Sequence, residues 1–150
     1  MNNDPSSAAA KSEAAIRTFL DGTLAGDKAL VQSGLHPEVV FRLPRPTMIA
    51  KTVNGAANLA DFMVDLLGAA YTDAHATYGV VVCNESGGVA EWRLQATLRR
   101  NGGPYDQYYC WVFKCVDGLI TDIHEYIDTH YGMSQNAAMG GDAIAAHAQE

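Results

Sequence analysis

The sequence is poor in basic residues. Only ten Lys and Arg occur among 150 residues, against seventeen Asp and Glu, and the formal net charge is −7. Apart from the pair Arg99-Arg100, the basic residues are scattered along the chain. Nucleic acids and anionic membrane surfaces bind proteins through clustered positive charge. The sequence therefore predicts no nucleic-acid or membrane partner.

Cysteine is also scarce, with Cys83, Cys110 and Cys115 as the three examples. They form no C-x-x-C motif and have no cluster of histidines nearby, so no metal site is predicted. We expect them to be small buried side chains in a reducing compartment. The N-terminus lacks a basic segment followed by an apolar one, and no apolar run approaches about 18 residues. These absences predict a cytoplasmic protein.

Several catalytic motifs are missing as well. The sequence contains no G-x-S-x-G elbow, no glycine-rich phosphate-binding loop and no dinucleotide fingerprint. Nucleophilic serine chemistry and nucleotide cofactors are therefore not supported, and we expect no cofactor. The apolar content of 48% is nevertheless enough to bury the core of one ordinary domain.

The first half of the sequence predicts three helices, over residues 9–24, 28–32 and 58–71. Ser6-Ser7 and Asp27 are suitable caps for the first two. Apolar residues recur at helical spacing in the first and third helices, with Phe19 and Phe62 among them. Residues 39–43 have strand-forming character, and the prolines that follow place this strand near a sheet edge.

The second half predicts four strands, over residues 76–83, 89–98, 105–116 and 119–126. The short turns between them imply an antiparallel meander, and helices followed by a meander indicate an α+β fold. We expect a flexible N-terminus at residues 1–8 and one domain over 9–131. Residues 132–150 are rich in Gly and Ala, and we expect a tail that is flexible or weakly helical from residue 142 to 148.

The strongest local feature is the turn Asp117-Gly118 between two strand-like runs, which is typical of a hairpin. In its second strand, Ile123, Glu125 and Ile127 share one face, and the residues between them share the other. Glu125 is therefore flanked by isoleucines on the apolar face. A carboxylate in that position either finds a partner or has a raised pKa, which suits a general acid or base.

Three stretches, together with this order of elements, resemble the SnoaL-like branch of the nuclear transport factor 2 superfamily. They are A-G-D-K-A-L-V-Q-S-G-L-H-P-E-V-V-F-R-L-P (25–44), G-A-A-N-L-A-D-F-M-V-D-L-L (55–67) and F-K-C-V-D-G-L-I-T-D-I-H-E-Y-I-D-T (113–129). The resemblance implies a conical α+β barrel in which three helices pack on a strongly curved, mostly antiparallel sheet around an apolar pocket. It also implies dimers that form through the outer surface of the sheet.

The resemblance does not choose a reaction, because the family includes ketosteroid isomerases, polyketide cyclases, limonene epoxide hydrolases, dehydratases, lyases and binding proteins. The Arg-x-Asp pair of the epoxide hydrolases falls on Trp92-Arg93-Leu94, which argues against their catalytic arrangement. The isomerase pattern is also not met, since Phe19 stands in the first helix, where those enzymes carry a Tyr.

If Glu125 faces inward, strand parity and the resemblance place other side chains around it. The predicted substrate-binding residues are Phe19, Phe62, Trp92, Leu94, Gln107, Trp111 and Ile127. The predicted catalytic residues are Glu125, Tyr109 as a donor to an oxyanion, and Arg42 as a partner of Glu125 or of a substrate carboxylate or phenolate. The alternatives remain open: the tryptophans fill a core, Tyr109 bonds to the backbone, or Arg42 is solvated.

These residues predict a cofactor-independent enzyme that uses general acid–base chemistry on a hydrophobic aromatic or polycyclic molecule. An isomerase, cyclase, hydratase, dehydratase or lyase would fit. The alternative is a non-catalytic binding or accessory protein that uses the same pocket. The opposite sheet face predicts a homodimer or higher oligomer, because it carries Tyr108, Cys110, Val112, His124 and Tyr126.

Overall fold

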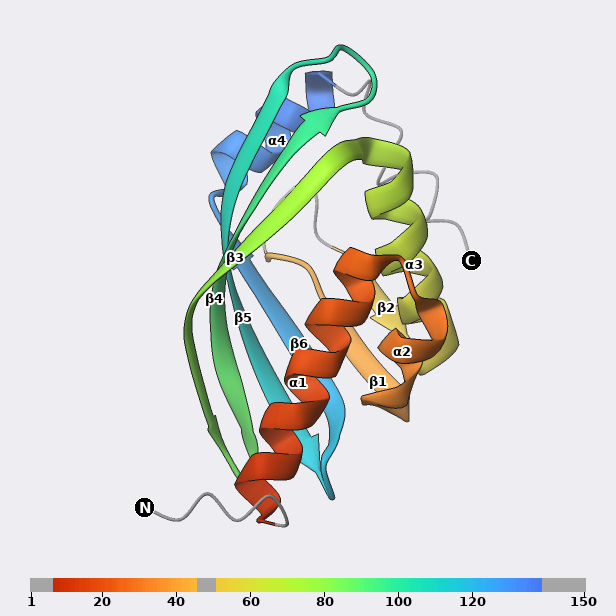
Figure 1. The fold of residues 1–150 in the computed structure, drawn as a ribbon, viewed down its shortest axis with the longest axis vertical. Coiled ribbons are helices and arrows are strands. Elements are labelled where there is room, and N and C mark those ends of the chain that lie inside the picture. Colours follow the sequence, from red (N-terminus) through yellow and green to blue (C-terminus); the bar gives the residue numbers. More distant parts are fainter. Residues whose placement is uncertain (1–6, 46–50, 139–150) are drawn as a thin grey trace.

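The computed structural model describes residues 7–45 and 51–138 (Figure 1). The helices are α1 (Ala8–Ala25), α2 (Lys28–Ser33), α3 (Ala56–Ala70) and α4 (Thr129–Ala138). The strands are β1 (Leu35–Arg42), β2 (Thr52–Asn54), β3 (Tyr71–Asn84), β4 (Gly87–Leu98), β5 (Pro104–Val116) and β6 (Leu119–Ile127). The α+β class is confirmed, with the three predicted helices and a fourth at the end of the described chain.

Helix α1 begins and ends as its sequence predicts. The Ser7 hydroxyl accepts a hydrogen bond from the Ala10 N–H, and Gly26 ends the helix in the left-handed conformation with φ of 69°. The face that carries Ile16 and Phe19 is fully buried. Burial of this apolar face against the sheet holds the helix in place.

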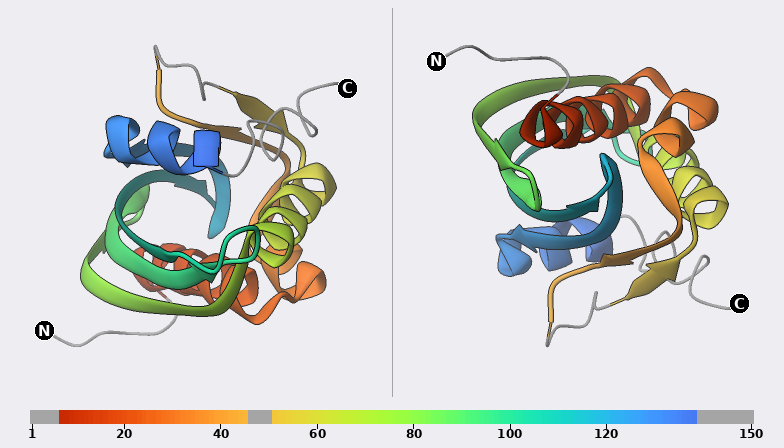
Figure 2. Two further views of the ribbon diagram at one scale, coloured as in Figure 1. Left: turned by 90° about the horizontal axis from the view of Figure 1, so that it is seen from above. Right: turned by 90° about the horizontal axis from the view of Figure 1, so that it is seen from below.

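The six strands form one sheet in the order β2-β1-β6-β5-β4-β3. All neighbouring pairs are antiparallel except β1 and β6, which run parallel. The sheet curls strongly, and α1, α2 and α3 close its concave side (Figure 2). Strand β1 therefore lies next to the edge rather than at it, because the short strand β2, which the sequence did not predict, pairs with its outer side.

The hairpin between β5 and β6 turns at Asp117 and Gly118, whose φ values of 52° and 77° are both left-handed, as in a type I′ turn. Beyond the turn the ladder contains a bulge. Cys115 pairs with Ile120 and Lys114 with Asp122, so Thr121 has no partner residue on β5. Strand β6 therefore holds one residue more than β5 over this stretch.

Helix α4 lies in the segment that we expected to be a flexible tail, so that prediction is wrong for residues 132–138. The Asp128 carboxylate accepts a hydrogen bond from the Tyr131 N–H at 3.0 Å, and the Asp106 N–H donates to the Tyr131 hydroxyl at 3.0 Å. These contacts outweigh the low helix propensity of Gly132. Residues 139–150, with the weak helix expected at 142–148, lie outside the described residues, as do residues 1–6.

None of the helices in the described ranges is long and apolar enough to cross a membrane.

Candidate functional site

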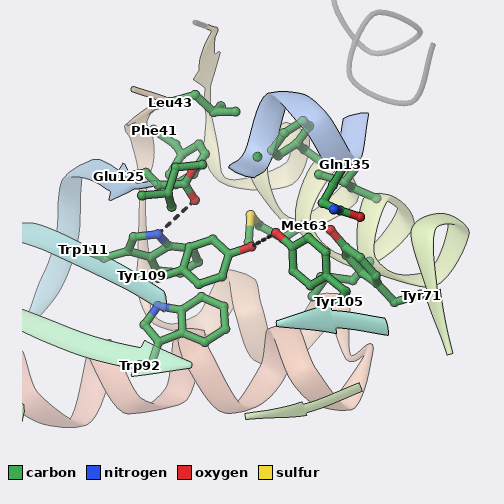
Figure 3. A pocket seen from close by; sticks show the side chains of 15 residues that line it. Phe41, Leu43, Met63, Tyr71, Trp92, Tyr105, Tyr109, Trp111, Glu125 and Gln135 are labelled. Atoms are coloured by element: carbon green, nitrogen blue, oxygen red, sulfur yellow. Dashed lines mark hydrogen bonds between the residues drawn. The ribbon is translucent and has the colours of Figure 1, made fainter. Parts of the chain in front are cut away.

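A cavity opens between the concave face of the sheet and helices α3 and α4 (Figure 3). Its volume is about 90 Å³, measured for the centres of water-sized molecules, and one water needs only ~10–15 Å³ on that measure. Most of its wall is apolar or aromatic, with Phe41 from β1, Met63 from α3 and Trp111 from β5. A few polar groups project from this wall, which is the composition typical of a small-molecule site.

Glu125 is the acidic side chain of the cavity wall. It stands opposite Trp111 in the sheet, only 8% of its surface is exposed, and its carboxylate accepts a hydrogen bond from Trp111 Nε1 at 3.0 Å. Burial raises the pKa of Glu125 to about 7, although the Trp111 hydrogen bond acts in the opposite direction. A carboxyl group with a pKa near neutrality can both accept and donate a proton.

Three tyrosines of the cavity wall form a linked cluster. The hydroxyl groups of Tyr105 and Tyr109 lie 2.7 Å apart and share a hydrogen bond, and the ring of Tyr71 packs against that of Tyr105 with centroids 4.7 Å apart. Burial raises the pKa of all three phenols, so they keep their protons at neutral pH. They can therefore serve as hydrogen-bond donors to an oxygen atom in the cavity.

Trp92 and Tyr109 stack face to face, with ring centroids 4.3 Å apart and planes inclined by 13°. The Trp92 ring also packs edge to face against the Trp111 ring, with ring centroids 4.9 Å apart. The Trp92 indole nitrogen is buried and has no hydrogen-bond partner among the described residues. This packing makes a stiff aromatic wall beside Glu125.

The structure brings together six of the ten residues predicted for the site: Glu125, Tyr109, Trp92, Trp111, Ile127 and Phe62. Leu94, Gln107 and Phe19 are buried but do not line the cavity. The Gln107 amide donates to the Asp128 carbonyl at 3.1 Å, and the Phe19 ring packs 5.7 Å from that of Trp111. These three residues support the wall from behind.

Arg42 is not in the cavity, contrary to our expectation. It pairs with His124 in the parallel ladder and forms an ion pair with Asp122 on the outer face of the sheet. The imidazole of His124 lies 2.8 Å from the same carboxylate. Arg42 therefore cannot pair with Glu125, which projects from the opposite face of β6.

Sequence reasoning missed Tyr71 and Tyr105. Tyr71 was expected to end the third helix but instead begins β3. Tyr105 shares the strand parity of Tyr109 and Trp111, and this periodicity could have identified it. Gly132 and Gln135 of α4 were missed because no ordered element was expected there.

In the described ranges, no cluster of three or more His, Cys, Asp or Glu side chains is placed to hold a metal ion.

A family model described as a SnoaL-like domain matches residues 16–123. No curated protein matches the sequence significantly. Among solved structures, a provisionally assigned SnoaL-like polyketide cyclase from Jannaschia sp. CCS1 has a TM-score of 0.75 at 14% identity, over 91% of this chain and 99% of that one. A provisionally assigned isomerase from Bacillus subtilis has a TM-score of 0.68 at 22% identity, over 88% and 94%.

An epoxide hydrolase from M. tuberculosis, of the limonene-epoxide-hydrolase-like type, also shares the fold. Its TM-score is 0.68 at 14% identity, over 91% of this chain and 97% of that one. Arg93 of the present chain lies on the outer face of the sheet, where its Nε donates to Asp106 at 2.7 Å. At these identities the similarity establishes the fold alone.

Proposed function

The chain belongs to the SnoaL-like family, and from that premise we propose that it is a cofactor-independent enzyme that moves protons on a hydrophobic cyclic or aromatic small molecule. One observation carries the proposal. Glu125 is a buried carboxyl group in an apolar, aromatic cavity, with Trp111 as its hydrogen-bond partner. A buried carboxylate in such surroundings destabilises the folded state, and a role in proton transfer accounts for its presence.

Glu125 acts as the general base and then as the general acid. Its carboxylate removes a proton from a carbon next to a carbonyl group, and the electron pair of the broken C–H bond moves into the enolate. The protonated Glu125 then returns the proton to another carbon or to a leaving hydroxyl group. A pKa of about 7 makes both directions accessible at neutral pH, because neither protonation state is strongly favoured.

The tyrosine cluster stabilises the negative charge that develops on the enolate oxygen. Tyr71, Tyr105 and Tyr109 all line the same cavity as Glu125, and their phenols remain protonated. Hydrogen-bond donors that are fixed in advance in a buried site stabilise an oxyanion more strongly than water does. An acid–base group beside an oxyanion site serves isomerisation, cyclisation, dehydration and retro-aldol lysis alike.

The apolar wall sets the substrate class. Stacked Trp92 and Tyr109 offer flat surfaces to a ring, and Phe41, Met63 and Leu67 complete the enclosure. The polyketide cyclase and isomerase among the structural neighbours are compatible with this class.

Proton exchange at a ketone tests the proposal without knowledge of the natural substrate. The protein is incubated with 2-indanone in D₂O, and loss of the α-proton signal is followed by NMR. We expect exchange well above the buffer rate, and the substitution Glu125→Gln should lower the protein-dependent rate by about 10²–10⁴-fold.

Glu91→Gln is the matched control, since Glu91 is exposed on β4 and the substitution removes the same charge. It should leave the exchange rate unchanged. A protein that binds 2-indanone but accelerates no exchange in any form would refute the proposal, and would favour the non-catalytic binding role.

A further inference from the structure

Among the described residues, no basic side chain lines the cavity. All ten Lys and Arg of the sequence fall within the described residues, and none of them lines the cavity. The same holds for the four histidines of the described ranges. Lys51 comes near, with its amino group 5.0 Å from the centre of the Phe62 ring, but does not itself line the cavity. Among the described residues that line the cavity, Glu125 therefore supplies the charge when it is ionised, and that charge is negative.

The tyrosine cluster has a hydroxyl hydrogen that no hydrogen bond within the cluster uses. Tyr71, Tyr105 and Tyr109 carry three hydroxyl hydrogens, and the hydrogen bond between Tyr105 and Tyr109 uses one of them. Whichever of these two hydroxyl groups donates, at least one O–H of the three tyrosines remains for a group outside the cluster. A ligand that satisfies it must present an acceptor atom.

From these two observations we infer that the cavity selects uncharged cyclic molecules that carry an acceptor oxygen, and excludes organic anions. The inference rests on the site of the proposed function but concerns binding rather than turnover. An anion would enter a buried site that already holds a carboxylate and offers no cation in return. An ammonium group would be attracted to Glu125, yet it brings only donors and leaves the tyrosine hydrogen unpaired.

Tryptophan fluorescence reports directly on this cavity, because the chain has two tryptophans and both line it. Three probes of similar size distinguish the ligand classes: cyclohexyl methyl ketone, cyclohexanecarboxylate and cyclohexylmethylamine. At about pH 9 Glu125 is ionised. We expect the ketone to bind at least about tenfold more tightly than the carboxylate, and more tightly than the amine.

Replacement of Glu125 by Gln should reduce the difference in binding affinity between the ketone and the carboxylate to within about threefold. The control Glu91→Gln should leave that difference unchanged. A thermal denaturation curve confirms that each variant is folded. If Glu125→Gln does not fold, the wild-type protein supplies the same test. As the pH falls from about 9 to about 6, the probe carboxylate stays ionised while Glu125 becomes protonated. The affinity of the protein for the carboxylate should therefore approach its affinity for the ketone.

The groups that face Glu125 do not interfere with this titration. Tyr105 and Tyr109 from β5 and Tyr71 from β3 have raised pKa values and stay neutral throughout. His124 lies with Asp122 on the other face of the sheet. His124→Gln should therefore leave the pH series unchanged.

Equal or tighter binding of the carboxylate at about pH 9 would overturn the inference, and so would preference for the amine. The result is independent of catalysis. Absence of α-proton exchange together with intact charge selection would remove the proposed function and leave the inference in place. Exchange without charge selection would do the reverse.

Discussion

Glu125→Gln should stabilise the protein, and the gain should depend on pH. Burial raises the pKa of Glu125 from its ordinary value of 4.5 to about 7, so the folded state binds a proton more tightly than the unfolded state. Below about pH 4.5 both states carry the neutral carboxyl group. As pH rises through the interval up to about 7, the unfolded state loses its proton first, and the folded protein loses stability relative to it.

The size of this effect follows from the difference between the two pKa values. Each pKa unit corresponds to about 1.36 kcal/mol, and a displacement from 4.5 to about 7 therefore costs about 3 kcal/mol once both states are ionised. Glutamine carries no such cost, and its side-chain oxygen can still accept the Trp111 hydrogen bond. Its amide hydrogens lack a clear partner, which leaves an expected gain of about 2–3 kcal/mol at pH ~8.

Urea denaturation of both proteins at several pH values measures the effect. The variant should exceed the wild type in free energy of unfolding above about pH 7, and the two curves should converge near pH ~4. Glu91→Gln, on an exposed position of β4, should change the free energy of unfolding by less than about 0.5 kcal/mol at either pH. A constant difference between Glu125→Gln and the wild type at all pH values would refute the assignment of a raised pKa to Glu125.

Three further expectations follow from the structure. Trp111→Phe removes the hydrogen bond to the carboxylate of Glu125 and should raise the pKa of that group by about one to two pH units, which a ¹³C carboxyl NMR titration would detect; an unchanged or lower pKa would contradict the geometry. Tyr126 is 56% exposed on the outer sheet face, and if that face joins two copies, light scattering should give twice the mass of one chain for the wild type and a single-chain mass for Tyr126→Glu. Gly87→Ala should destabilise the fold by more than about 2 kcal/mol in urea denaturation, because its φ is 141° and a Cβ would lie 2.1 Å from the Phe113 carbonyl oxygen, whereas Gly68→Ala in α3 meets no atom within 4 Å and should stabilise it by about 0.5 kcal/mol.

The inward position of Glu125 could be predicted because it depends on a local pattern. Two isoleucines at alternating positions, next to a turn whose residues favour a left-handed backbone, identify the buried face of β6 without knowledge of any other strand. Arg42 could not be placed in the same way. Its face is set by the parallel pairing of β1 with β6, which joins Arg42 to His124, 82 positions away in the sequence. Register between such distant strands has no local signature.

Helix α4 and Tyr71 were missed for a related reason. The sequence of α4 has weak helical character, and the helix is held by tertiary contacts such as that of Tyr131 with the backbone of β5. Tyr71 follows a long helical pattern without a break, so its change to strand geometry is set by pairing with Leu98 on β4. One of the three clustered tyrosines, Tyr71, could therefore be placed only from the three-dimensional structure.

The bulge at Thr121 determines which residues of β6 face the cavity. Thr121 has no partner on β5, and every residue of β6 after it is displaced by one position relative to an unbroken ladder. If Thr121 took a place in the ladder instead, His124 would stand opposite Trp111, so that the pairing of Trp111 with Glu125 would be lost and the two faces of β6 would exchange. That register would turn the imidazole of His124 and the phenol of Tyr126 toward the cavity in place of the carboxyl group of Glu125, whereas deletion of Thr121 would remove the bulge and leave Glu125 opposite Trp111. The bulge therefore absorbs the extra residue of β6 and keeps the carboxyl group of Glu125 on the cavity side of the sheet.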